Sequence, residues 1–248
     1  MRSRLEIVAE YRSGHTVISR ISGGGHFAAR RTGDGEVHMV GTAAGPLGGD
    51  EVTIMVRVAP GACLRVRSAG ATIIQPGLRA PGSRLTVDLQ VADGAELDFA
   101  PQPTVVCHAA EHLAMTSAQI SGEGRLRLVE HVVLGRANEP GGHWVGRLAV
   151  QRDDRPVVRH TLRSSLLASS GVRVISTLLD ASTGSERASA THGDAVAMPL
   201  AAGGLLVTAT GRALLPTEAD LFAALTAAEQ RHVGTQKRTG RAATAPIG

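Results

Sequence analysis

Two acidic residues interrupt segments that are otherwise apolar or rich in glycine. Asp50 follows the run from Gly45 to Gly49, where a short carboxylate could cap a turn or point into a channel. Glu130 interrupts the apolar run 126–134, and if the leucines of that run face inward, two-residue alternation turns Glu130 inward with them. A buried carboxylate is costly unless it is paired, bound to a cation or reached by internal water.

Two explanations for an inward Glu130 remain open from the residues alone. An ion pair with an arginine such as Arg136 would satisfy the carboxylate without any further function. A hard or borderline cation that passes between oxygen and imidazole ligands would also explain it. The sequence does not choose between these two explanations.

A second cluster follows Cys107, where His108 and His112 would share one face of a helix as metal ligands do. The preceding Val105-Val106 is typical of a strand, which favours a core cysteine beside a surface histidine. His26 follows the glycine run 23–25, which lacks the lysine and hydroxyl residue of a phosphate loop and is typical of a flexible turn. Neither cluster predicts a metal or phosphate site.

Catalytic arrangements are missing from the sequence. No Gly-x-Ser-x-Gly elbow is present for a serine nucleophile. Glu96 and Asp98 are two residues apart on an expected strand, so both carboxylates point to solvent, opposite Leu97 and Phe99. A hydrolase or lyase on a β-helix would need clustered acids on one strand face, and too few are found. We therefore expect that the protein is not an enzyme and holds no tightly bound cofactor.

The alternation of apolar and polar residues from Asp50 to about Leu134 predicts strands. Pro60-Gly61 and Asp93-Gly94 interrupt the alternation, and both are typical of the turns of β-hairpins. The segment 58–64 recurs as 91–97, at an offset of 33 residues. A repeated strand-turn-strand unit must bury its apolar face against a neighbour, either in a β-solenoid of stacked coils or across a sandwich. The prediction is an all-β scaffold.

The character of the sequence changes near Pro216. Leu221, Phe222 and Leu225 recur at helical spacing, which predicts one C-terminal helix near residues 217–233. The tail 235–248 is rich in Thr, Ala, Arg and Gly and is expected to be disordered. We expect one β-rich domain over residues 1–234, helix included.

Composition excludes several classes of protein. The formal net charge is +4, but aromatic residues make up only 2% of the chain, so the stacking platform of a nucleic-acid-binding protein is missing. The two cysteines, Cys63 and Cys107, form neither a disulfide framework nor a zinc spacing. No secretory signal and no apolar run of about 18 residues is found. We expect a cytoplasmic protein that binds neither nucleic acid nor membrane.

Ordered blocks of sequence resemble the urease accessory protein family UreD, called UreH in some organisms. The blocks are Gly48-Gly49-Asp50, Val58-Ala59-Pro60-Gly61-Ala62, Gly70-Ala71-Thr72, Leu97-Asp98-Phe99-Ala100-Pro101-Gln102 and Leu134-Gly135-Arg136. They cover about half of the chain, roughly residues 45 to 165. The chain departs from the family at Ile73-Ile74-Gln75, Val129 and Pro103, where the family often has Lys-Phe-Tyr, Trp and an acid.

The resemblance implies a stacked-strand β-helical scaffold that has no activity of its own. Such a scaffold binds UreF, which recruits the GTPase UreG, and docks on apo-urease so that transient nickel reaches the urease active site through an internal route. By position in the family blocks, Asp50, Thr72 and Glu130 are the candidates that line this route. The alternative is a β-solenoid binding module with no metal role, in which the inward acids form salt bridges.

Overall fold

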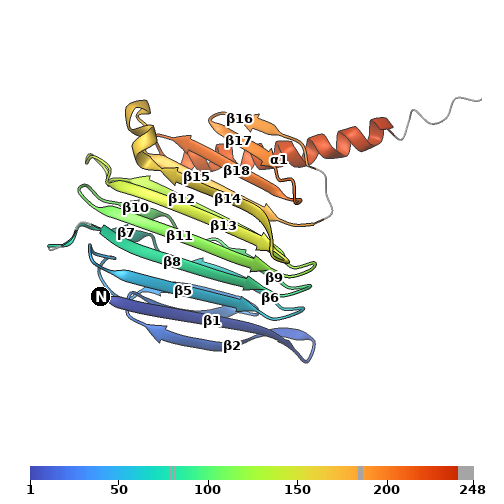
Figure 1. Ribbon diagram of the computed structural model, residues 1–248, viewed down its shortest axis with the longest axis horizontal. Coiled ribbons are helices and arrows are strands. Elements are labelled where there is room, and N and C mark those ends of the chain that lie inside the picture. The colour runs from blue at the N-terminus through green and yellow to red at the C-terminus, as the bar shows by residue number, and fades with distance from the viewer. Residues whose placement is uncertain (79, 81, 184–186, 240–248) are drawn as a thin grey trace, which may run out of the picture.

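The computed structural model describes residues 1–78, 80, 82–183 and 187–239, which form two sheets, a 3-10 helix and one α-helix (Figure 1). The first sheet consists of β1 (Arg2–Arg12), β2 (His15–Gly24), β5 (Glu51–Val58), β8 (Gly82–Val91), β11 (Glu111–Ile120), β13 (His143–Arg152) and β14 (Arg155–Arg163). The second consists of β3 (Phe27–Gly33), β4 (Glu36–Gly41), β6 (Cys63–Ser68), β7 (Thr72–Ile74), β9 (Glu96–Phe99), β10 (Thr104–Val106), β12 (Arg125–Leu134), β15 (Val174–Ala181), β16 (Ala190–His192), β17 (Ala195–Pro199) and β18 (Leu205–Gly211). The helices are η1 (Ser164–Ser170) and α1 (Leu214–Thr239).

The chain winds as a coil between the two sheets. From β5 in the first sheet it crosses to β6 and β7, returns to β8, crosses again to β9 and β10, and returns to β11. Successive strands of one sheet pair in parallel, and Val58 of β5 lies opposite Val91 of β8. The 33-residue repeat is therefore one turn of the coil. The predicted all-β, solenoid-like scaffold with a C-terminal helix is confirmed, and its stacked coils also form the two sheets of a sandwich.

The turns after β5 and β8 were expected to close hairpins, and that expectation was wrong. In each turn an amide bonds back to a carbonyl, Ala62 to Ala59 and Ala95 to Ala92, at 3.1 Å, and a glycine takes a positive φ. The strand before the turn lies in the first sheet and the strand after it in the second. A tight turn fixes only the local reversal; because both strands bury one apolar face, the lower-energy arrangement places those faces opposite each other across a core.

Antiparallel strands end the parallel stack at both edges of the first sheet. β2 returns alongside β1, and β14 returns alongside β13. In the second sheet, β3 pairs antiparallel with β4 at one edge, and β15, β18, β17 and β16 continue antiparallel from β12 at the other. The coil thus occupies the middle of the molecule, between antiparallel ends.

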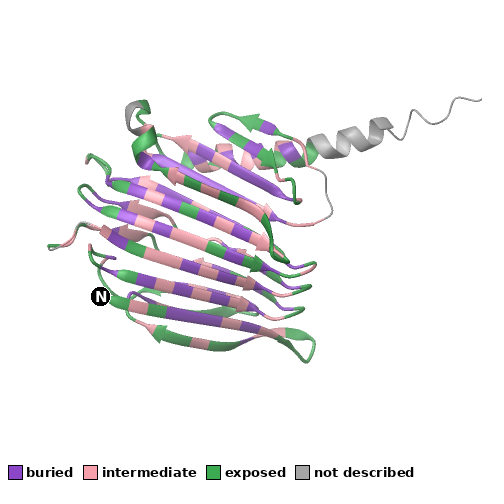
Figure 2. Ribbon diagram, viewed as in Figure 1, coloured by how far each residue is buried: buried purple, intermediate pink, exposed green. Residues whose placement is uncertain are grey.

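The main core lies between the two sheets. Its residues alternate with exposed ones along each strand, as the banding in Figure 2 shows. A second core lies under α1, where Leu221, Ala224 and Ala228 pack on Leu178 and Val129 of the second sheet. The helix extends beyond the expected residues 217–233 at both ends, and residues 235–239, expected in the tail, belong to it. Residues 240–248, the rest of that tail, lie outside the described residues.

Candidate functional site

A cavity of about 40 Å³ lies between the two sheets, enough for a few water molecules. It occurs where two coils interrupt their second-sheet strands, between β6 and β7 and between β9 and β10. Most of its wall is apolar. The polar residues among those that line it are Ser68, Thr72, Gln102, Thr104, Thr116, Glu130 and His131.

Glu130 lies on β12 and faces inward, as the alternation with buried Leu128 and Val132 requires. Within the described part of the chain its carboxylate makes no hydrogen bond or ion pair, and part of its surface stays open to the cavity. Burial raises the pKa of Glu130 to about 7. The arginine considered as its partner, Arg136, instead bonds Glu139 through both Nε and Nη2, at 3.1 and 3.0 Å.

Thr72 lies at the first position of β7, next to Thr104 of β10 in a parallel ladder. Thr104 in turn lies opposite Val132 of β12, two residues beyond Glu130 on the same inward face. The structure thus brings Thr72 and Glu130 to one cavity although 58 positions separate them in the sequence. Hydroxyl and carboxylate oxygens are donors that suit a hard or borderline divalent cation.

Ser68 fixes the two strand breaks against each other. Its hydroxyl accepts a hydrogen bond from the Gln102 amide at 2.8 Å and donates to the Gly70 carbonyl at 3.1 Å. The Thr72 amide bonds the carbonyl of Pro103 at 2.9 Å. These backbone groups of the breaks are therefore satisfied by Ser68 or by each other, without the side chains of Thr72 and Glu130.

Asp50 lies apart from the cavity, at the beginning of β5. Its carboxylate accepts hydrogen bonds from the Leu47 amide and His26 Nε2, each at 2.9 Å, and pairs with the terminal ammonium group of Met1. Burial alone would raise the pKa of Asp50, but these hydrogen bonds outweigh burial and lower it. Asp50 is a turn cap with an additional ion pair, whose Met1 side is half-exposed. Along the inner face of β5, Ile54 is the residue that reaches the cavity, about 13 Å further on.

Two buried residues at this end of the first sheet were missed from the sequence. His26, expected only as part of a flexible turn, bonds Asp50 and also Ser3 Oγ at 2.9 Å. His112 Nδ1 bonds Ser83 Oγ at 2.9 Å, while its Nε2 has no partner in the described part of the chain. Burial lowers the pKa of His112 to about 4, so the ring is neutral. Strand alternation from Glu111 could have predicted an inward His112.

The proposed helical metal pair at Cys107 is excluded by the backbone. Cys107 and His108 lie in the loop before β11, whereas His112 lies on that strand, so the two histidines share no helical face. Cys107 is buried and His108 is exposed, as the strand interpretation predicted. Over residues 1–78, 80, 82–183 and 187–239, no group of three or more His, Cys, Asp or Glu could hold a metal ion.

The acid pair Glu96 and Asp98 faces outward on β9, as expected. Glu96 pairs with Arg125 at 3.0 Å and Asp98 with Arg67 at 2.6 Å. Both acids therefore form ion pairs between neighbouring coils on the outer face.

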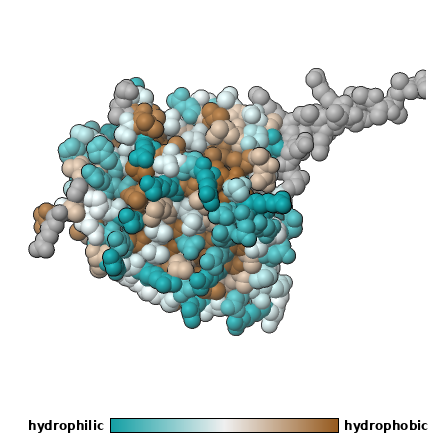
Figure 3. All heavy atoms as spheres, in the orientation of Figure 1, coloured by the Kyte–Doolittle hydropathy of each residue, from teal (hydrophilic) through white to brown (hydrophobic). Residues whose placement is uncertain are grey.

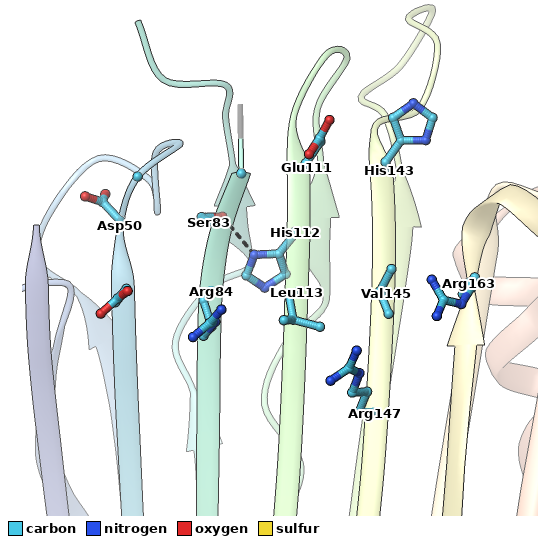
Figure 4. Close-up of a pocket in the computed structure, with 13 residues that line it drawn as sticks. Asp50, Ser83, Arg84, Glu111, His112, Leu113, His143, Val145, Arg147 and Arg163 are labelled. Atoms are coloured by element: carbon cyan, nitrogen blue, oxygen red, sulfur yellow. Dashed lines mark hydrogen bonds between the residues drawn. The ribbon is translucent and has the colours of Figure 1, made fainter. Parts of the chain in front are cut away.

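An open groove of about 460 Å³ runs beside Asp50 along the first sheet (Figure 4). Its three carboxylates are matched by three arginines, Arg84, Arg147 and Arg163. The face of the molecule in Figure 3 likewise mixes hydrophilic and hydrophobic side chains. The groove gives a cation no net attraction, so the interior cavity is the better candidate site.

Gly48, two residues before Asp50, stands where a side chain has no room. A Cβ there would overlap the carbonyl oxygen of Ala80 and lie 2.5 Å from the Gly77 nitrogen. We expect Gly48→Ala to lower the free energy of unfolding by about 2 kcal/mol, measured by urea denaturation. The control is Gly70→Ala, where a Cβ meets no atom within 4 Å and the change is expected to be within about 0.5 kcal/mol. Equal free energies of unfolding for the two variants would show that the loop makes room for the added Cβ with no loss of stability.

The fold and the cavity define a strand-built scaffold that encloses a few polar groups, and no described helix is long and apolar enough to span a membrane. The family model for the UreD urease accessory protein matches residues 1–244. The chain therefore belongs to the UreD family of urease accessory proteins.

Individual relatives agree with the family model. The urease accessory protein UreD of Parafrankia sp. is 35% identical over 247 residues, which cover 84% of this chain and 82% of that relative. The UreD of Frankia alni is 49% identical over 115 residues, or 46% of this chain and 38% of the relative. That of Streptomyces coelicolor is 39% identical over 153 residues, 60% of each chain. The matched part thus spans between 38% and 82% of these relatives' own lengths, and membership supports a role in urease maturation.

Proposed function

We propose that the protein is a non-catalytic chaperone that scaffolds UreF, and through it UreG, on apo-urease in the cytoplasm, and conducts nickel to the urease active site. The observation that carries the nickel role is the unpaired, inward Glu130 on the wall of a cavity large enough for water. An unpaired carboxylate in a core costs stability, and a transient cation gives it a function.

Weak binding suits this function. A conduit must accept its cation and also release it, which a complete set of ligands would prevent. Glu130 and the hydroxyl of Thr72 provide oxygen donors without the three-residue cluster of a resident metal site. Asp50 would act as a separate, transient cation contact at the end of the first sheet. Its three hydrogen-bond donors make it the weaker of the three candidates.

The test is the nickel content of urease produced together with its accessory proteins. Glu130→Gln removes the charge while keeping the shape, and Thr72→Val removes only the hydroxyl. We expect Glu130→Gln to lower the rate of nickel incorporation by about tenfold, because a lost interaction with a charged group is worth about 1.5 kcal/mol. Nickel per urease active site is measured by elemental analysis.

The matched control is Glu96→Gln, which removes an outward-facing carboxylate from the neighbouring strand. Its nickel incorporation is expected to equal that of the unchanged protein. Co-purification of each variant with UreF and the urease subunits checks that the complex still forms. Full nickel content with Glu130→Gln in an intact complex would refute the conduit and leave the binding module without a metal role.

A further inference from the structure

The cavity and a surface groove share part of their walls. The groove, of about 410 Å³, lies between α1 and the second sheet, and Glu218 and Phe222 of α1 form one side of it. Pro101, Gln102, Val129 and His131 line both the groove and the cavity. The cavity and the groove are therefore adjacent, on two sides of these residues of β12 and of the segment between β9 and β10.

The shared wall coincides with a gap in the strand pairing. β9 pairs with β12 as far as Phe99 and Leu128, and β10 resumes the pairing at Thr104 and Val132. The segment 100–103 between them contains two prolines, which have no amide to donate. The Gln102 amide bonds Ser68 instead of β12. At this point the Ser68 side chain, and not a backbone ladder with β12, bonds the segment.

Polar groups continue from the cavity through this gap. Glu130 faces the cavity, and the next residue, His131, faces the groove because adjacent strand residues point to opposite faces. His131 is 7% exposed; its Nδ1 bonds Ser176 Oγ at 2.8 Å and its Nε2 lies 3.8 Å from Glu218 Oε1. Asp98, which also lines the groove, has a buried Oδ1 without a partner in the described part of the chain.

Taken together, the charged side chains of the groove do not repel a cation. Arg67 is neutralised by Asp98 at 2.6 Å, and Arg127 lies over the ring of Phe222, 5.9 Å from its centroid. The carboxylate of Glu218 and the imidazole of His131 are a pair of donors that borderline divalent cations accept.

We propose that the gap between β9 and β10 is the mouth through which a hydrated divalent cation passes between the groove under α1 and the interior cavity. Gln102 is the side chain that narrows the mouth, and His131 with Glu218 forms its outer contact. The inference rests on the proposed conduit, and it specifies where the conduit meets the surface.

Access to the cavity can be measured without urease. In a Cys63→Ser background, Thr72→Cys places a thiol in the cavity wall, and a small cationic methanethiosulfonate reagent reports how fast that thiol is reached. The background protein, whose remaining Cys107 is buried, gives the baseline rate. Thr104→Cys is a second reporter in the same wall, for use if the first does not fold.

Plugging and widening the mouth should have opposite effects. We expect Gln102→Trp to slow modification of the reporter by about tenfold and Gln102→Ala to accelerate it. The control is Gln119→Trp, an exposed position on the first sheet, with a rate unchanged within about twofold. If the reporter thiol is modified as fast in the Gln102→Trp variant as in the reporter protein that keeps Gln102, the mouth lies elsewhere and the proposal is wrong.

Addition of Ni²⁺ alone tests passage of the cation. We expect Ni²⁺ to slow modification of the reporter, and to slow it less when Glu218→Gln is also present. The absence of slowing in every variant would overturn the cation role of the mouth. A mouth confirmed by the reporter together with normal urease nickel in Glu130→Gln would refute the proposed conduit alone, so the two failures are distinguishable.

Discussion

Glu130→Gln is expected to raise the free energy of unfolding by about 3 kcal/mol at pH 8 and to leave it nearly unchanged near pH 4. The folded protein holds an unpaired carboxylate whose pKa is raised from 4.5 to about 7, and that difference corresponds to about 3 kcal/mol. Below pH 4.5 the carboxyl is neutral in both the folded and the unfolded chain, so the penalty is absent. As the pH rises from 4.5 through 7, the unfolded chain ionises first and the folded state loses stability.

Urea denaturation of both proteins between pH 4 and 8 measures this difference. Subtracting the two curves removes the contribution of every other titrating group. A constant difference across this range would show that Glu130 is paired or solvated in the folded protein. Together with the expected loss of nickel incorporation, a more stable but less active variant would separate the function of this carboxylate from any structural role.

Leu221→Ala is expected to destabilise the protein by about 3 kcal/mol. Leu221 is fully buried where α1 packs on the second sheet, and its truncation leaves a cavity in that core. Leu215→Ala, six residues earlier on the same helix, removes a side chain that is 75% exposed and is expected to change the stability by less than about 0.5 kcal/mol. Hydrogen exchange of the α1 amides should become faster only in the first variant.

The comparison of these two variants tests how α1 is held. Equal stability of Leu221→Ala and Leu215→Ala would mean that the helix is attached through its polar contacts, such as Glu218 with His131. Because α1 also forms one side of the groove, its release is expected to increase the rate at which the Thr72→Cys reporter is modified.

The sequence predicted the 33-residue repeat, and the family resemblance predicted the coil, but neither showed how the strands pair. The 33-residue offset is a long-range regularity, and it corresponds to the register that pairs Val58 with Val91. The Pro60-Gly61 turn is local, and it could not indicate that its two strands belong to different sheets. Pairing is decided by which apolar faces can be buried together, which depends on strands far apart in the chain.

The candidate site was predicted only in part, again because local patterns do not show which distant segments meet. Alternation along one strand was enough to turn Glu130 inward, and the cavity wall confirms that orientation. The partner of Asp50 was missed because His26 lies in the bend between β2 and β3, 24 positions away, and reaches Asp50 only in the folded protein. The cavity itself was out of reach, since it arises where the breaks 69–71 and 100–103 are stacked on each other.

The antiparallel strands at the edges give the coil a fixed length. An antiparallel strand at an edge still has open backbone groups, but it does not offer the parallel pairing in which a further coil would add. β14 carries Pro156 together with Arg155, Arg159 and Arg163, and a proline and repeated like charges both disfavour the addition of a strand. Addition of a further strand is therefore disfavoured at the β14 edge of the first sheet.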